Sequence, residues 1–261
     1  MYLTEIKDQL LNESLSSIPD GKLLISAMNA YCFCILQKDE TYKSAIKRSH
    51  YLLPDGISIV WAMKFLTGQK VKKIAGEELF HWEMARLQQK KGKCFFLGSC
   101  LDTLEKIVSR IKYQYPDVGV GYYSPPFKHE FNDEENAIMI NEINNFSPDV
   151  LFIGMTAPKQ EKWGAIHFEN LKTNHICCIG AVFDFCAKTK RRAPNWIINI
   201  GCEWLFRLIQ EPRRNWRRYI IGNSLFIHLV MMEKVARISS FINIHANLLR
   251  EVKNKGTELQ N

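Results

Sequence analysis

Short apolar runs alternate with longer amphipathic segments through the first 187 residues of the chain. The runs are rich in branched and aromatic side chains and are bounded by Gly, Pro or charged residues, which is typical of buried β-strands. Five strands are predicted from them: Leu23 to Met28, Cys94 to Leu97, Val118 to Tyr122, Val150 to Ile153, and Ile176 to Ile179.

The segments between these runs have the spacing of amphipathic helices. In one of them Leu104, Ile107 and Ile111 recur at helical spacing, with Lys106 and Arg110 between them. Six helices are predicted: Thr41 to Tyr51, Ile57 to Thr67, Glu77 to Lys90, Leu101 to Tyr115, Asp133 to Asn145, and Lys159 to Leu171. Strands that alternate with helices are joined by crossover connections, so we expect an α/β fold with a mainly parallel sheet.

The pattern changes near Pro194, where consecutive helices follow one another without strands. Three are predicted: Trp196 to Gln210, Pro212 to Phe226, and about Ile227 to Val252. Pro212 suits the first position of a helix, because its missing N–H has no partner there in any case. We therefore divide the chain into an α/β domain, residues 1–193, and a helical appendage, residues 194–261.

The charge of the chain is concentrated near this boundary. Residues 1–187 hold 21 basic and 22 acidic side chains, whereas residues 188–220 hold nine and two, which accounts for most of the net charge of +8. The composition, 46% hydrophobic and 24% charged, is otherwise that of a globular protein. A nucleic-acid binder using Arg with Trp and Tyr would carry basic residues over the sheet domain as well. We therefore expect no nucleic-acid partner.

Several signals bear on the compartment. The eight cysteines form no C-x-x-C pair and lie mostly in apolar runs, which favours reduced, buried thiols in the cytoplasm. The first 20 residues carry acids and lack the apolar core of a signal peptide. The most apolar late stretch, Tyr219 to Met232, is too short to span a bilayer.

Two strand ends are candidates for ligand binding, since ligands of parallel sheets bind beyond the carboxyl ends of the strands. At Gly98 a small turn beside a helix start could receive a phosphate, although plain turn chemistry also explains it. After Gly154, Thr156 and Glu161 are spaced to cap a helix opened by Pro158. That account leaves Lys159 and Gln160 unexplained, and a cation beside an amide suits a sugar or a phosphate.

Asp55, within Pro54-Asp55-Gly56, is the candidate catalytic base. It either caps the helix that begins at Ile57 or serves as a carboxylate held by the restricted backbone around it. The sequence has no nucleotide-binding glycine loop, no serine-hydrolase elbow, no H-E-x-x-H and no D-x-D. Metal-dependent sugar-nucleotide transferases usually use a D-x-D motif to hold a divalent ion on the diphosphate of their substrate. Without that motif, the charge of a diphosphate would have to be neutralised by Arg, Lys and helix N-termini, and we expect no metal ion and no cofactor.

A series of short motifs then falls in a recognisable order. They are Asn29, Pro54-Asp55-Gly56, Ile74-Ala75-Gly76, Phe96-Leu97-Gly98, Gly154 with Pro158-Lys159-Gln160-Glu161, Gly180-Ala181-Val182-Phe183-Asp184-Phe185, Arg192-Ala193-Pro194, Glu203-Trp204-Leu205-Phe206-Arg207, and Glu211-Pro212-Arg213-Arg214. This series resembles the WecG/TagA/CpsF glycosyltransferases over roughly residues 20 to 225. Two positions depart from the family: Ala27, where the teichoic-acid branch has Thr, and Lys188, where a Gly is common.

The resemblance implies a Rossmann-like α/β domain with a C-terminal helical appendage that docks on the membrane. It implies an inverting, metal-independent bacterial enzyme that moves a sugar from a UDP-sugar to a polyprenyl-diphosphate-linked saccharide in surface polysaccharide synthesis. The donor sugar would be N-acetylmannosamine, its uronic acid or glucose. A catalytically inactive UDP-sugar-binding protein is the alternative.

The resemblance also assigns roles to residues. Asp55 matches the proposed general base, and Asn29 and Gln160 match residues of the sugar pocket. Four arginines fall in the appendage whose arginines contact the diphosphate: Arg207, Arg214, Arg217 and Arg218. For Asp184 we favour a structural pairing with Arg191 or Arg192, and for Glu203 an ion pair between the appendage and the body.

The appendage combines these cations with apolar side chains that suit a lipid boundary. The apolar residues are Ile220, Ile221, Leu225, Phe226, Leu229 and Val230. We therefore expect a peripheral protein on the cytoplasmic face of the plasma membrane. The alternative is that these side chains pack onto the body or onto a second copy of the chain, which would make the protein a homo-oligomer.

Overall fold

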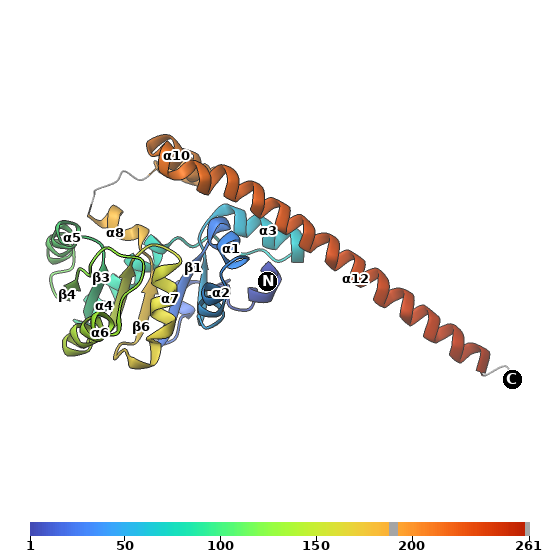
Figure 1. Ribbon diagram of the computed structural model, residues 1–261, viewed down its shortest axis with the longest axis horizontal. Coiled ribbons are helices and arrows are strands. Elements are labelled where there is room, and N and C mark those ends of the chain that lie inside the picture. The colour runs from blue at the N-terminus through green and yellow to red at the C-terminus, as the bar shows by residue number, and fades with distance from the viewer. Residues whose placement is uncertain (188–192, 259–261) are drawn as a thin grey trace.

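The computed structural model describes residues 1–187 and 193–258, with the side chains of this range other than those of 195, 199, 214 and 242–258. Its centre is a six-stranded sheet in the order β2-β1-β6-β5-β3-β4, in which all neighbouring strands are parallel (Figure 1). The strands are β1 (Leu23–Met28), β2 (Tyr51–Pro54), β3 (Lys93–Gly98), β4 (Gly119–Tyr123), β5 (Val150–Gly154) and β6 (His175–Cys178). The expected α/β class with a parallel, Rossmann-like sheet is confirmed.

The five predicted strands are confirmed within one residue at each end, and β2 is the strand that the pattern did not predict. The helix predicted from Thr41 to Tyr51 ends at Lys47, and Tyr51 already belongs to β2. β2 is only four residues long and ends in Pro54, which removes a ladder donor. An edge position tolerates this proline, and the sequence pattern alone does not distinguish so short an edge strand from a loop.

Helices cover both faces of the sheet. One face carries α6 (Asp133–Phe146) and α7 (Lys159–Ile166), and the other carries α4 (Gly76–Lys90), α5 (Leu101–Gln114) and α8 (Ala181–Cys186). Beside β2 a third apolar cluster joins the 3-10 helix Leu3–Ile6 with α1 (Ala30–Leu36), α2 (Glu40–Lys47) and α3 (Ile57–Thr67). A second 3-10 helix is Leu15–Ser17, and a third, Phe168–Asn170, follows α7. The apolar run of α1 is a helix that the sequence pattern did not predict.

The strands are buried on both sides, which explains why they are nearly continuous apolar runs. In β3, Cys94 and Phe96 belong to the cluster under α4, α5 and α8, whereas Phe95 and Leu97 belong to the cluster under α6 and α7. Successive side chains of a strand point to opposite faces, so a sheet covered on both faces needs apolar residues at every position.

The appendage differs in detail from the predicted three helices. It consists of α9 (Asn195–Asn199), α10 (Glu203–Gln210), α11 (Pro212–Trp216), a π-helical turn (Arg217–Ile221) and α12 (Gly222–Glu258). Gly201, at φ 77°, interrupts the first predicted helix, because a left-handed residue cannot continue one. The break predicted near Ile227 does not exist, and α12 continues directly from the π-helical turn.

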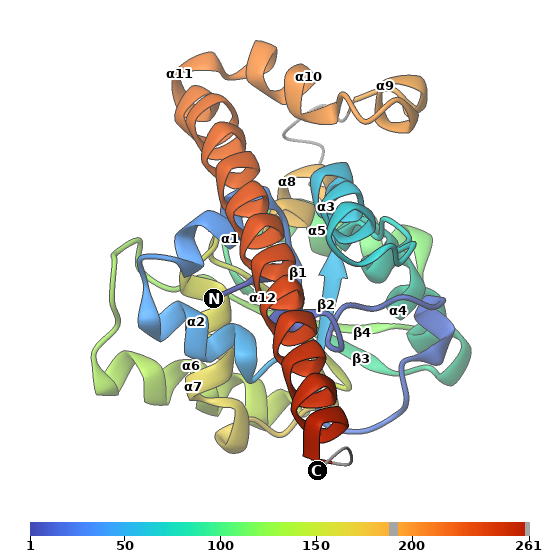
Figure 2. The ribbon, with the colours of Figure 1, turned by 90° about the vertical axis from the view of Figure 1, so that its right-hand side faces the viewer.

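The long helix α12 crosses the outside of α1 and α3 (Figures 1 and 2). Phe226 packs edge-on against Phe33 with ring centroids 5.7 Å apart, and Val230, one turn further, is also buried. The prediction that Phe226 and Val230 face a lipid boundary is therefore wrong, since their side of the helix faces the body. Ile220 and Ile221 are exposed as expected.

Glu233 anchors α12 to the first residues of the chain. Its carboxylate is buried and accepts hydrogen bonds from the N–H of Leu3 (2.7 Å), the N–H of Thr4 (3.0 Å) and the hydroxyl of Thr4 (2.6 Å). Cys34 adds a contact from its thiol to the carbonyl of Gly222 at 3.4 Å. The start of the chain, the first helices and α12 therefore form one packed unit.

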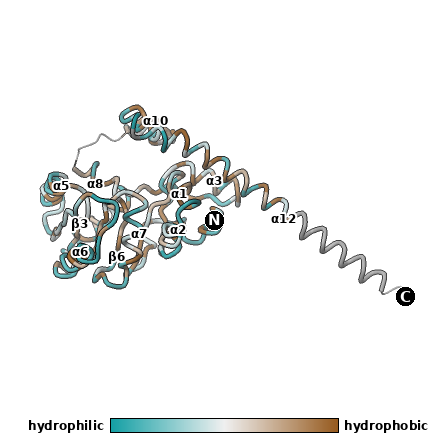
Figure 3. Tube along the Cα trace, viewed as in Figure 1, coloured by the Kyte–Doolittle hydropathy of each residue, from teal (hydrophilic) through white to brown (hydrophobic). Residues whose placement is uncertain are grey.

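All eight cysteines are free thiols and six of them are buried, in agreement with the sequence. Apolar and polar residues mix along α12 as far as its side chains are described (Figure 3). Within the part of the chain that the structure describes, no helix has the length and apolar character needed to cross a membrane.

Candidate active site

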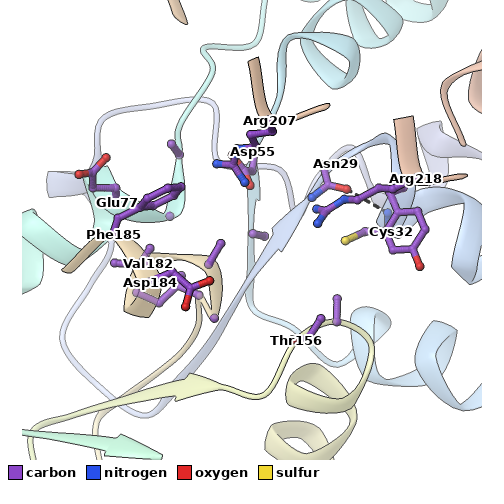
Figure 4. Close-up of a pocket in the computed structure, with 18 of the residues that line it drawn as sticks. Asn29, Cys32, Asp55, Glu77, Thr156, Val182, Asp184, Phe185, Arg207 and Arg218 are labelled. Atoms are coloured by element: carbon purple, nitrogen blue, oxygen red, sulfur yellow. Dashed lines mark hydrogen bonds between the residues drawn. The ribbon is translucent and has the colours of Figure 1, made fainter. Parts of the chain in front are cut away.

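A polar cavity of about 180 Å³ lies at the carboxyl ends of β1, β2, β5 and β6. The loops after these strands supply its lower wall with Asn29, Asp55, Thr156 and Gly180. The appendage covers it from above with Glu203, Arg207, Asn215 and Arg218. Figure 4 shows Asp55 and Arg207 together, with Asn29 and Arg218 on one side and Asp184 on the other. The cavity is thus built jointly by the α/β domain and the appendage.

Asp55 follows β2 directly, and its N–H donates to the carbonyl of Met28 at 2.9 Å, which holds it next to the end of β1. The N-cap of α3 is Gly56, at φ 129°, and α3 has no side-chain cap. The capping role considered for Asp55 is therefore wrong, and its carboxylate lines the cavity. Burial raises the pKa of Asp55, and the positive charge of Arg207 partly offsets that rise.

Asn29 caps α1, because its side-chain oxygen accepts a hydrogen bond from the N–H of Cys32 at 3.0 Å. That bond fixes the side chain and leaves its amide NH₂ as the group that can meet a ligand. Gln160 is fixed in the same way: its NH₂ donates to Glu161 at 2.8 Å and its oxygen accepts from the N–H of Gly180 at 3.2 Å. A Cβ at residue 180 would lie 2.5 Å from that oxygen, so the glycine makes room for the amide.

Glu161 does not complete a capping box. The helix α7 has no side-chain cap, and Thr156 adopts φ 69° while its carbonyl accepts from the N–H of Lys159 at 3.0 Å. Glu161 is buried on the cavity wall, and its second oxygen has no hydrogen-bond partner among the residues that the structure describes. Burial raises the pKa of Glu161 to about 7 despite the hydrogen bond from Gln160. Its role in holding Gln160 was not evident from the sequence.

Arg207 is held by two neighbours, one of which connects it to the body. Its guanidinium donates to Glu203 at 2.6 Å and lies over the ring of Phe185 at 5.0 Å, while Glu203 pairs with Lys73 of the body at 3.6 Å. The predicted ion pair of Glu203 with the body is therefore confirmed. Burial disfavours the charge of Arg207, but Glu203, Tyr219 and Asp55 raise its pKa overall, so it stays cationic.

Arg218, in the π-helical turn of the appendage, lines the same cavity as Arg207. Its guanidinium carbon is 5.1 Å from the ring centre of Tyr31 and 5.6 Å from that of Tyr219. Its Nε is buried and has no hydrogen-bond partner among the described residues. A buried donor without a partner is costly, and an anionic ligand in the cavity would supply the acceptor.

The structure places the other predicted site residues elsewhere. Gly98 and Gly154 do not line the polar cavity. A Cβ at residue 98 would lie 2.5 Å from the carbonyl oxygen of Gly154, and a Cβ at residue 154 would meet the ring of Phe183, so both glycines serve packing. Lys159 donates to the carbonyl of Lys128 at 2.5 Å and covers the ring of Phe131, outside the cavity.

The remaining two arginines have different outcomes. Arg217 is exposed and lies over the ring of Trp216, away from the cavity. The side chain of Arg214 lies outside the described residues, as do Arg191 and Arg192, the predicted partners of Asp184. Asp184 itself is half-buried on the cavity wall. Within the described residues, no cluster of His, Cys, Asp and Glu is arranged to hold a metal ion.

A polar cavity at the carboxyl ends of a parallel sheet, lined by a carboxylate and two arginines, is the place where α/β enzymes bind their ligands. The chain matches the model of the Glycosyl transferase WecG/TagA/CpsF family over residues 3–240 and belongs to that family. The protein is therefore a glycosyltransferase.

Curated relatives share the same printed name, N-acetylglucosaminyldiphosphoundecaprenol N-acetyl-beta-D-mannosaminyltransferase. The chain is 29% identical to the protein of Bacillus subtilis (strain 168) over 199 residues. The matched region covers 76% of this chain and 75% of that protein. It is 27% identical to the protein of Bacillus spizizenii (77% and 75% covered) and 25% identical to that of Staphylococcus aureus (strain MW2) (76% and 74% covered).

Proposed function

We propose that the protein transfers N-acetylmannosamine from a UDP-sugar, with inversion, to a polyprenyl-diphosphate-linked saccharide in bacterial surface polysaccharide synthesis. The names of its relatives support this sugar and this kind of acceptor. Of the two positions that depart from the family, Ala27 lines the polar cavity, and Lys188 lies outside the described residues. N-acetylmannosaminuronic acid and glucose are therefore the two further donor sugars to test.

The position of Asp55 is the observation that carries the proposal. Its carboxylate lies on the cavity wall, next to Arg207 and within electrostatic reach of Arg218. An acceptor hydroxyl is a poor nucleophile until a base takes its proton, and a base works best when its pKa lies close to the working pH. The burial that raises the pKa of Asp55 therefore makes this carboxylate a better base than an exposed aspartate.

The reaction follows from this arrangement. The acceptor oxygen forms a bond to the anomeric carbon while its proton passes to Asp55, and the bond from that carbon to the UDP oxygen breaks on the opposite face. A single displacement of this kind inverts the anomeric configuration. The charge that develops on UDP is stabilised by Arg207 and Arg218, whose planar guanidinium groups match phosphate oxygens. These two cations take the part that a metal ion has in other sugar transferases.

The proposal includes a location on the cytoplasmic face of the plasma membrane. The appendage exposes large apolar side chains from α9 to the π-helical turn, namely Trp196, Ile200, Leu205, Ile209, Trp216, Ile220 and Ile221. Exposed Arg213 and Arg217 lie among them. Apolar side chains with interspersed cations favour an interface with anionic lipids.

The test is transfer to a short-chain polyprenyl diphosphate that carries N-acetylglucosamine, with a panel of UDP-sugars, followed by mass spectrometry of the product. We expect a product with N-acetylmannosamine, formed equally well in the presence of a metal chelator. Asp55→Asn should lower turnover by at least about a hundredfold while UDP-sugar binding is retained. Near-normal turnover of this variant would require another base.

The alternative is a catalytically inactive UDP-sugar-binding protein. It predicts that calorimetry detects UDP-sugar binding to the wild-type protein but that no acceptor in the panel becomes glycosylated. The same experiment therefore separates the two functions.

A further inference from the structure

A second cavity, of about 500 Å³, adjoins the polar cavity between α3 and α12. We call it the apolar groove, because its far part is lined by Trp61, Phe65, Phe226, Ile227, Val230 and Met231. Trp61 is 65% exposed and Ile227 is 62% exposed. Single exposed apolar residues are common, whereas two apolar helix faces that open onto one concave space indicate a binding site.

At its near end the apolar groove shares lining residues with the polar cavity. Seven residues line both spaces: Asn29, Tyr31, Asp55, Glu203, Arg207, Arg218 and Tyr219. The two cavities therefore meet at the candidate base and the two arginines. Lys73, which lines only the groove, adds a third cation near this junction.

The chemistry changes in a fixed order along this path. The polar cavity comes first, then Arg207 and Arg218, and then the apolar faces of α3 and α12. A ligand that fits this order has a polar end, an anionic middle and an apolar tail. On the basis of the proposed function, we infer that the apolar groove binds the first isoprenoid units of the acceptor, with its diphosphate at the arginines and its saccharide hydroxyl at Asp55.

The surface of α12 continues the path outward from the groove. Ile227, Met231, Val235 and Ile238 are exposed and follow one another at helical spacing, so they form an apolar stripe. A polyprenyl chain is much longer than the groove, and its remainder needs an apolar route back to the bilayer. The stripe supplies that route. A bilayer surface or a second copy of the chain would cover the stripe but would not explain a concave end at Asp55.

The test compares two acceptors that carry N-acetylglucosamine diphosphate on either one or four saturated isoprenoid units. The full-length wild-type protein should have a much higher kcat/KM for the longer acceptor. Trp61→Ser and Ile227→Ser should each lower the ratio of the two kcat/KM values by about tenfold, because the tail loses apolar contact area. Ile166→Ser is the matched control, since Ile166 is an exposed apolar residue that lines neither cavity; it should keep the wild-type ratio.

The outcomes separate the inference from the function on which it rests. A wild-type protein that glycosylates both acceptors, with variants that keep its chain-length preference, overturns the groove assignment alone. Variants that lose only vesicle binding, or only a dimer, overturn it as well and identify a bilayer surface or a second copy as the occupant. A wild-type protein that glycosylates neither acceptor overturns the proposed function together with the inference.

Photocrosslinking provides a second measurement that does not depend on the stability of any variant. An acceptor with a diazirine on its second isoprenoid unit should label peptides from α3 and from the first turns of α12 in the wild-type protein. Competition by the unmodified acceptor should remove the label. Labelling confined to other parts of the chain would overturn the inference.

Discussion

Asp55 and Arg207 interact electrostatically, and each shifts the pKa of the other. Burial raises the pKa of Asp55 and Arg207 lowers it, while Asp55 contributes to the raised pKa of Arg207. In the proposed mechanism Asp55 must be deprotonated to act as the base, so we expect activity to fall as the pH drops through the pKa of Asp55. Arg207 keeps this loss at lower pH than burial alone would.

Replacing Arg207 should move the acid limb of the pH profile. In Arg207→Gln the pKa of Asp55 rises further, so the decline of kcat/KM should begin at higher pH than in the wild type, in addition to a loss of about a hundredfold in rate from the missing phosphate contact. Arg217→Gln is the matched control, because Arg217 lies outside both cavities. An acid limb that stays at the wild-type pH in Arg207→Gln would show that Asp55 is not the titrating base.

Individual residues could be predicted from the sequence where a motif constrains their backbone. Asp55, Asn29 and Gln160 lie on the cavity wall as expected, since each directly follows a strand or begins a helix. Gly98 and Gly154 were predicted to bind the ligand, but Gly98 allows the ends of β3 and β5 to pack closely and Gly154 makes room for the ring of Phe183. A glycine that makes room for a ligand and a glycine that makes room for a packed neighbour look the same in the sequence.

At the scale of elements, α12 presents two different faces. Phe226, Val230 and Glu233 face the body, and Ile227, Met231 and Ile238 face outward. From the sequence, we expected the apolar residues of this region to lie together at a membrane. Both faces are apolar, so helical periodicity does not reveal which one is buried, and the partner of Glu233 lies 230 residues away in sequence.

Glu233 should contribute strongly to the attachment of α12. Glu233→Ala leaves the N–H groups of Leu3 and Thr4 without their acceptor, and each such loss costs about 1 to 3 kcal/mol. We expect the free energy of unfolding, measured by urea denaturation, to fall by about 2 to 4 kcal/mol. Glu233→Gln, which keeps one acceptor oxygen, should be affected less.

The control for this experiment is Glu105→Ala, at an exposed position in the middle of α5, which should change the free energy of unfolding by less than about 0.5 kcal/mol. Equal stability of Glu233→Ala and the wild type would mean that α12 is not held by this anchor.

On the scale of the whole molecule, the appendage covers the polar cavity and also exposes the large apolar side chains that we propose to contact lipid. The charge pattern of the sequence predicted that this segment is functional, because its arginines stand out against a nearly neutral body. The resemblance implied that arginines of the appendage reach the site, and an ion pair of Glu203 with the body was expected. The residue pattern alone could not identify Lys73 as its partner, because the two residues are far apart in the sequence.

Membrane association should depend on the exposed apolar residues of the appendage. In Ile209→Asp combined with Ile220→Asp, the fraction bound to vesicles with anionic lipid, measured by sedimentation at low salt, should fall about tenfold. Binding of the wild type should weaken as salt is raised, because lipid charge is screened. Phe127→Asp, at an exposed apolar residue of the α/β domain, is the control. Unchanged sedimentation of the double variant would place the membrane contact elsewhere.

The hydrogen bond between the N–H of Leu3 and Glu233 also has a consequence for folding during synthesis, because it joins the two ends of the packed chain. The N-terminal residues leave the ribosome first, and their partner is made 230 residues later. Closing so long a loop is entropically costly, so this contact forms late. Arg218 precedes Glu233 in the chain and lies in the π-helical turn that continues directly into α12, so its final placement depends on where α12 is seated. A nascent or C-terminally truncated chain can therefore fold its sheet and still lack a working site.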